Sequence, residues 1–249
     1  MSSQLKNPVQ FGRTASEGTR ESAQAALVDV GSYLHSRGWS LATSSNYSVV
    51  LSRDPLRLLL TASGKDKGRL KRTDFVVVDE TGRAVAPTDQ RPSAETLLHV
   101  ALAQQQGVGA VLHTHSVWGT LVSDWRREAG FVRIADYEML KGLEGIHTHE
   151  HALDVPIFDN TQDIAALAAQ VEARLADRVH PLQYGFLIHR HGLYTWGRDL
   201  DEARRHVEVF EFLFEVVGRS MEPPRRQERP EERMTRNQGG SDGHDYDSQ

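Results

Sequence analysis

The apolar pattern of this chain changes near residue 94, and that change constrains the fold more than any other feature. Before it, the β-rich runs YSVVLS and LRLLLTA flank an Arg-Asp-Pro turn, and FVVVDETGRAV repeats the pattern around a Thr-Gly turn. These runs predict two antiparallel hairpins. After it, apolar stretches of helix and strand length alternate. Hairpins followed by crossovers predict a mixed, largely antiparallel central sheet in a three-layer α/β/α sandwich, not a doubly wound parallel sheet.

The period of the apolar residues assigns the individual elements. Helices are expected over 22–34, 94–105, 117–126, 164–175 and from 200 to about 217. Later strands are expected at 109–113, 155–159, 186–188 and 193–196. These elements predict one domain over 19–221, flanked by a disordered segment 1–18 and a disordered charged tail 222–249.

Composition narrows the possible functions. The formal charge of −5 is spread over both halves of the chain, so nucleic-acid binding is not expected. The absence of an apolar run of roughly 18 residues and of a secretory signal predicts a cytoplasmic protein without membrane contact. The chain has no cysteine and 12 histidines, so a transition-metal site would use imidazole and carboxylate ligands.

Two histidines end an apolar strand in GVGAVLHTHS. Because side chains alternate across a strand, His113 and His115 point to the same side. A catalytic zinc takes three protein ligands and keeps one position open, so a third ligand must come from elsewhere. His191 is the candidate, because it follows a second apolar strand and precedes Gly192, where the backbone can approach closely. The alternative is a chance H-x-H pair at polar strand ends.

A second group of histidines competes with this site. It alternates in the same way within GIHTHEHAL, beside Glu150, and consists of His147, His149 and His151. No apolar strand fixes these side chains, so a solvated loop is favoured. His189 shares strand parity with His191 and is either its partner or an ordinary buried histidine.

Three short polar stretches suit an anionic substrate: 43–46, 61–65 and 91–95. They offer hydroxyls, backbone N–H groups and the Lys65 ammonium, which are the groups that bind phosphate. Ser93 is a plausible N-cap of a helix whose N-terminus favours anions. None has the Walker spacing. Each is also compatible with an ordinary turn, and Glu95 with a common first-turn acid.

Glu138 in DYEMLKGL is a candidate for general acid or base catalysis. Near a metal, that role needs a carboxylate that is not a permanent ligand. From the residues alone, the alternative is a surface acid near Lys141.

Taken together, T-S-x-N, T-x-S-G, P-S-x-E, H-T-H-S and H-G resemble, in this order, the class II aldolase/adducin superfamily. Within it, LHTHS, YEMLKGL, VPIFDNTQDI and RHGLYTWGRDLDEARRHVEVFEFLFE resemble the dehydratases of methionine salvage. The resemblance implies a class II aldolase-like catalytic domain over 19–221 and a homotetramer with active sites near subunit interfaces. The implied reaction is zinc-dependent dehydration of the sugar phosphate 5-methylthioribulose 1-phosphate to 2,3-diketo-5-methylthiopentyl 1-phosphate.

The same resemblance implies the roles of individual residues. One zinc ion per subunit would be bound by His113, His115 and His191. Glu138 would be the catalytic acid or base, and Glu95 would lie near the metal. The implied phosphate pocket consists of Ser45, Asn46, Ser63, Gly64 and Ser93. We expect Glu138 to protonate the departing C4 hydroxyl, while Glu95 and Glu138 are both candidates for removing the C3 proton.

Two positions depart from the superfamily pattern: Ser45, where many members have Gly, and His189, where relatives often carry Arg. Two other functions are open. A class II sugar-phosphate aldolase or epimerase, for example on fuculose or ribulose phosphates, would break or remake a carbon–carbon bond at the same site. An adducin-like scaffold would retain the fold and bind through its charged tail. The candidates for lining a methylthio pocket are Trp118, Tyr137, Leu140 and Phe158.

Overall fold

A computed structural model describes residues 17–221 of the chain. The expected disorder of 1–18 and 222–249 lies outside the described residues, except at 17 and 18, which belong to the first helix. The α-helices are α1 (Glu17–Ser36), α2 (Thr96–Ala103), α3 (Val117–Trp125), α4 (Ile164–Leu175) and α5 (Leu200–Met221). Among the described helices, none has the length and apolar character needed to cross a bilayer.

The strands form one eight-stranded sheet with the order β3-β2-β1-β4-β8-β7-β6-β5. They are β1 (Asn46–Arg53), β2 (Leu56–Thr61), β3 (Phe75–Val78), β4 (Ala110–Thr114), β5 (Phe131–Ala135), β6 (Ala152–Phe158), β7 (Gly185–Ile188) and β8 (Gly192–Gly197). Neighbours are antiparallel except for β6 and β7, which run parallel. The predicted mixed, largely antiparallel sheet is therefore confirmed.

Two local details differ from the prediction. The segment FVVVDETGRAV does fold back at the Thr-Gly turn, where Asp79 bonds to Arg83 and Val85 bonds to Val77, but it forms only the isolated bridge from Val78 to Ala84 and no second strand. Residues 83–89 are exposed, so no apolar face holds them on the sheet. Strand β5 was missed, since its alternation places only Val132 and Ile134 in the core.

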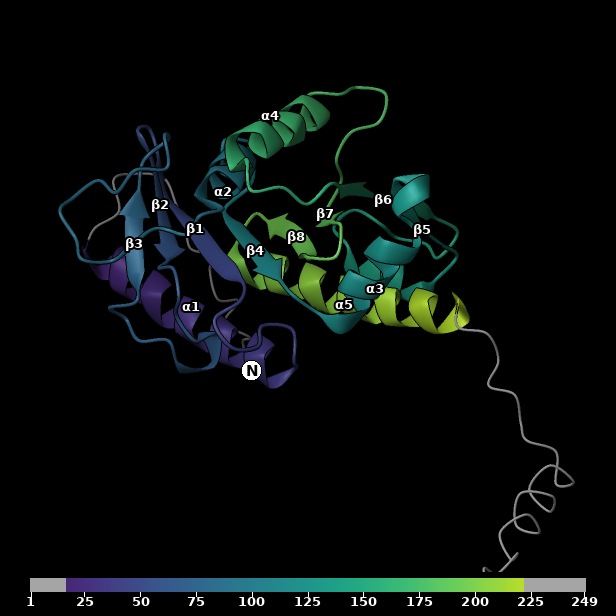
Figure 1. Cartoon of the computed structure of the whole chain (residues 1–249), viewed down its shortest axis with the longest axis horizontal. Helices are drawn as coiled ribbons and strands as arrows, with labels where there is room; N and C mark the ends of the chain where they lie inside the picture. Colours follow the sequence, from purple (N-terminus) through teal and green to yellow (C-terminus); the bar gives the residue numbers. More distant parts are fainter. Residues whose placement is uncertain (1–16, 222–249) are drawn as a thin grey trace, which may run out of the picture.

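Helices cover both faces of the sheet, which gives the three layers of Figure 1. Helices α2 and α4 lie on one face, where they pack against alternate side chains of β4, β7 and β8. Helices α1, α3 and α5 lie on the other face. Because neighbouring residues of β4 face opposite layers, Leu112 packs toward α1 and α5, whereas Val111 packs toward α2 and α4.

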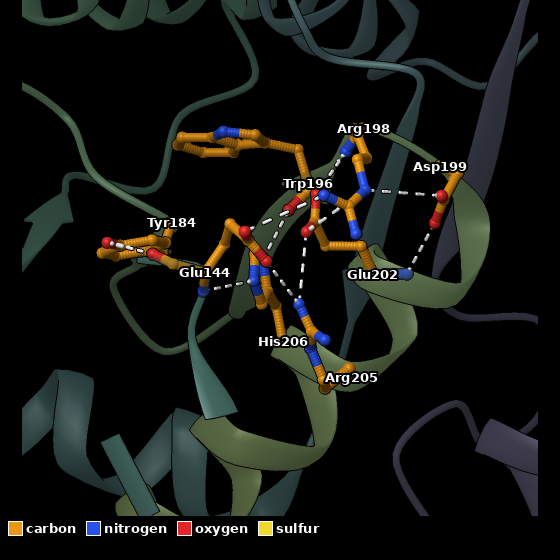
Figure 2. A network of polar contacts seen from close by, with 8 residues as sticks. All are labelled: Glu144, Tyr184, Trp196, Arg198, Asp199, Glu202, Arg205 and His206. Carbon is orange, nitrogen blue, oxygen red and sulfur yellow. Dashed lines mark hydrogen bonds and ion pairs between the residues drawn. The ribbon is translucent and has the colours of Figure 1, made fainter. Parts of the chain in front are cut away.

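A polar network joins Glu144, which follows the 3-10 helix η3 (Glu138–Gly142), to α5 and β8 (Figure 2). The backbone N–H of Glu144 donates to Nε2 of His206 at 3.3 Å, and Nδ1 of His206 donates to the Trp196 carbonyl at 2.7 Å. The Arg205 guanidinium bridges Glu144 and Glu202 at 3.1 and 3.2 Å. This network fixes the start of the segment that carries the second group of histidines.

Candidate active site

Strand β4 lies between β1 and β8, and this position fixes His113 at its end. The His113 ring is fully buried and stacks on Tyr194 with 4.0 Å between the ring centroids. Its Nδ1 lies 2.9 Å from the Leu193 carbonyl, which can only accept a hydrogen bond, so Nδ1 donates. The lone pair of the neutral ring is therefore on Nε2, which faces the other two histidines.

Three imidazoles converge at this point. Nε2 of His113 lies 2.8 Å from Nε2 of His115 and 3.4 Å from Nε2 of His191. All three offer ligand atoms within 4.8 Å of one another, the only such group of three among residues 17–221. Burial lowers the pKa of His113 well below its usual range and the pKa of His115 to about 3, with the neighbouring histidines adding to the effect at both. Neutral rings are the form that binds a metal.

Glu95 is the residue before α2, and its carboxylate faces the three histidines. One oxygen, Oε2, lies 3.6 Å from Nε2 of His113 and accepts a hydrogen bond from Asn46 at 2.7 Å. The other, Oε1, lies 3.6 Å from Nε2 of His191 and is buried without a hydrogen-bond partner. The side chain of Asn46 is held in turn by His99, whose Nδ1 lies 2.8 Å from Ser48 Oγ.

The expected cap of α2 was wrong in detail. Glu95, not Ser93, occupies the N-cap position, and no side chain caps this end. The Ser93 hydroxyl instead accepts from the Glu95 backbone N–H at 3.2 Å, in a local turn that places the carboxylate toward the histidines.

The donor set fits a divalent cation. The lone pair on Nε2 of His113 faces Nε2 of His115 at 2.8 Å and Nε2 of His191 at 3.4 Å, so three imidazole nitrogens surround one point. The adjacent Glu95 oxygen also has no partner, and a buried carboxylate oxygen without a partner is costly. A cation held by the three imidazoles would keep one position open, as in catalytic zinc sites, and would offset the negative charge of the nearby Glu95 carboxylate.

A cavity of about 420 Å³ opens beside the histidines. It is lined by all five residues expected to bind phosphate, which are Ser45, Asn46, Ser63, Gly64 and Ser93, and also by Glu95, His115 and His191. Lys65 is not among the lining residues, because its ammonium pairs with Asp74 at 3.1 Å. Lys67 lines the cavity instead. Sequence reasoning missed it, because a lysine in a short 3-10 turn gives no pattern that predicts burial.

Glu138 does not line this cavity. It begins η3, its side chain is 69% exposed, and it is ion-paired with Lys141. The hydrogen bond from Lys141 lowers the pKa of Glu138. Within residues 17–221, the structure therefore does not bring Glu138 together with the three histidines, and none of the four candidates for a methylthio pocket lines the cavity either.

The competing histidines do not form a metal site in the described chain. His147 and His149 are exposed, and His149 lies 3.7 Å from Glu138. His189 is not a partner of His191. It lies beyond the end of β7 and pairs with Asp124 at 3.0 Å, and Arg190 binds the same carboxylate.

Comparisons with known proteins show what this chain is similar to in sequence and in fold. The chain is 50% identical over 198 residues to a methylthioribulose-1-phosphate dehydratase of Pseudomonas fluorescens, covering 79% of this chain and 92% of the relative. It is 49% identical over 200 residues to the protein of the same name from Marinobacter nauticus, covering 80% and 94%. In fold it is similar to an L-fuculose-1-phosphate aldolase of Thermus thermophilus, with a TM-score of 0.62, 23% identity, and 80% and 94% of the two chains covered.

The family model described as "Class II Aldolase and Adducin N-terminal domain" matches residues 25–217. That range includes the three histidines and every residue that lines the cavity. This chain therefore belongs to the class II aldolase and adducin family.

Proposed function

We propose that this protein is a hydro-lyase that converts 5-methylthioribulose 1-phosphate to 2,3-diketo-5-methylthiopentyl 1-phosphate in methionine salvage, with zinc bound by His113, His115 and His191. The observation that carries the proposal is the convergence of three imidazoles and Glu95 beside a cavity rich in hydroxyls. The identity of about half the residues with proteins named for this reaction supports the choice of substrate.

The reaction removes the C3 proton and the C4 hydroxyl as water, and the resulting enol takes a proton at C4 to become the diketone. A bound divalent ion supplies Lewis acidity, which makes the C3 proton beside the C2 carbonyl acidic. Glu95 is suited to accept that proton, because its Oε1 faces the cavity without a partner. The Asn46 hydrogen bond to Oε2 orients the carboxylate for this transfer.

Glu138 is proposed to protonate the departing C4 hydroxyl, from a second copy of the chain. Its side chain is exposed on η3 and lies away from the cavity of its own chain, so the role requires an assembly in which η3 of one subunit approaches the cavity of another. A homotetramer provides such an interface. The tetramer and a cytoplasmic location both stay predictions.

The test is turnover of 5-methylthioribulose 1-phosphate by protein of measured metal content. Formation of the diketone, with activity lost on chelation and restored by zinc, is the expected result. A class II aldolase would instead release dihydroxyacetone phosphate from its sugar phosphate, so the same reaction mixtures are assayed for both products. Carbon–carbon cleavage without water loss would mean that the protein is an aldolase and not a hydro-lyase. Folded protein that has neither bound metal nor turnover would favour a scaffold.

A further inference from the structure

Lys67 is a buried lysine in the wall of the cavity. It begins the 3-10 helix η1 (Lys67–Arg69), and only 1% of its surface is exposed. It lines the cavity together with the loop 43–46 and with Ser63 and Gly64. A lysine is almost never buried to this extent unless it has a partner for its charge.

The ammonium of Lys67 is bonded only to neutral groups. Its Nζ donates to the carbonyl of Lys65 at 2.6 Å and of Thr43 at 3.4 Å. No ion pair joins it to a carboxylate in the described chain, whereas Lys65, two residues earlier, pairs with Asp74. Burial lowers the pKa of Lys67 to about 8, although the charges of Asp66 and Asp74 oppose the shift. A buried charge without a counter-ion is costly to the folded protein.

Ser45 gives a second, independent sign of a missing ligand on the same cavity. Its hydroxyl is buried without a hydrogen-bond partner, and its backbone has a φ of +71°. A non-glycine residue in this left-handed region is strained. A hydroxyl without a partner and an ammonium without a counter-ion thus line the same cavity, and an anion bound there would be a partner for both.

We propose that Lys67 is the counter-charge for the phosphate group of the substrate, and that it determines the preference for phosphorylated over unphosphorylated sugars. The identity of the sugar in this inference rests on the proposed function. The binding of a phosphate anion does not depend on it. A phosphate dianion placed against Ser45, Ser63 and Gly64 would accept hydrogen bonds from hydroxyl and backbone N–H groups and receive a charge-assisted bond from Lys67.

The competing role for Lys67 is purely structural, because its two hydrogen bonds join the loop of Thr43 to the loop that carries Lys65 and Lys67. The two roles differ in what they change. Loss of a phosphate partner weakens the binding of any phosphate and raises KM, with kcat little affected. Loss of a loop anchor lowers the temperature of unfolding and reduces kcat, because the whole site is displaced.

The experiment compares Lys67→Met with Lys65→Met in the full-length protein. Lys65→Met removes a charge from the same loop but outside the cavity. Binding of inorganic phosphate is measured by calorimetry, and KM and kcat are measured with the sugar phosphate. For Lys67→Met we expect phosphate binding weaker by about 30-fold, as for loss of a charged hydrogen bond, a similar rise in KM, and kcat within about threefold. Lys65→Met should stay within about threefold of wild type in all three quantities.

Lys67→Arg covers the case in which the methionine variant fails to fold. Because it keeps the charge, it should retain phosphate binding to within about tenfold of wild type. Wild-type phosphate affinity in Lys67→Met, or equal weakening in both methionine variants, would overturn the proposal. The phosphate titration does not depend on turnover, so failure of the proposed reaction and failure of the Lys67 assignment give separate results.

Discussion

Two histidine groups in this chain have the same H-x-H spacing and different surroundings. His113 and His115 end a central strand, and their rings meet the ring of His191. His147 and His149 lie on an exposed segment before β6 and form no such group. Spacing alone therefore does not make a metal site, because ligands must also be held in one geometry by the residues around them.

The first group is supported from several directions. His113 is bonded through Nδ1 to β8, the His115 backbone N–H donates to Trp39 at 2.8 Å, and the His191 N–H donates to Ile188 at 3.1 Å. The ring of His149 in the second group has one partner among the described residues, the exposed carboxylate of Glu138 at 3.7 Å. An ion pair between exposed side chains contributes little to stability, so it does not hold the His149 ring in one orientation.

The largest expected effect is that of His191→Ala against His149→Ala. Removing one of three ligands should abolish metal binding and leave less than about 0.1% of the activity, because the remaining two imidazoles lack the affinity of a full site. His149→Ala should keep the metal and more than about half of the activity. Metal content by mass spectrometry and turnover are measured on the same samples, and loss of metal in the His149 variant would reverse the comparison.

Glu138→Gln gives the next largest effect. The amide cannot donate or accept the catalytic proton, so turnover should fall by about 10²–10⁴-fold while the metal content stays at the wild-type level. Lys141→Met is the matched control, because it removes the partner of Glu138 but not the carboxylate. Normal turnover by Glu138→Gln would remove its proposed role.

Mixing subunits tests whether Glu138 acts on another copy. Glu138→Gln subunits keep the three histidines, and His191→Ala subunits keep Glu138. If the sites are shared between copies, co-assembly of the two inactive variants should restore activity at mixed interfaces. No recovery in assemblies shown to contain both variants would mean that each site uses its own Glu138 or none.

The sequence was sufficient for the helices, for most of the strands and for placing His113 and His115 on one side of a strand, because strand alternation is a local property. It was insufficient where distant residues pack against one another. Nothing near Lys67 predicts a buried ammonium, and nothing near Glu95 predicts that Asn46 and His191 lie beside its two oxygens. The distance of Glu138 from the cavity of its own chain likewise depends on how η3 packs against α5, which no short motif encodes.

Glu211 lies on α5, in the layer opposite the three histidines, and contacts the strand that carries His113. Changing it should have a smaller effect than the changes above, and the effect should be on stability. Glu211 accepts from Thr114, between two of the histidines, at 3.2 Å, and its other oxygen is unpaired. Burial raises the pKa of Glu211 from 4.5 to about 7. The folded state then binds more protons than the unfolded state between these values, so this group lowers stability as the pH rises from about 4.5 through 7.

Glu211→Gln should remove that loss, since the amide stays neutral. Relative to wild type, the variant should gain on the order of 3 kcal/mol of unfolding free energy between pH 5 and pH 8, at 1.36 kcal/mol per pKa unit. Urea unfolding at the two pH values measures it. Parallel pH dependence of variant and wild type would show that Glu211 titrates normally in the folded protein.

The smallest effect is expected where the second group is anchored. Tyr184 donates to the Glu144 carbonyl at 2.7 Å, at the start of the exposed segment (Figure 2). This bond is exposed, so water replaces it in Tyr184→Phe, and stability should fall by less than about 1 kcal/mol. The unfolding temperature should drop by about 1–3 °C, with metal content unchanged.

Thr114→Val is the matched change next to His113 and His115, and it should lower the stability more than Tyr184→Phe does, because it leaves buried Glu211 without this donor. Equal losses in the two variants would mean that the two histidine groups are supported to the same degree, and that burial of the ligands alone separates them.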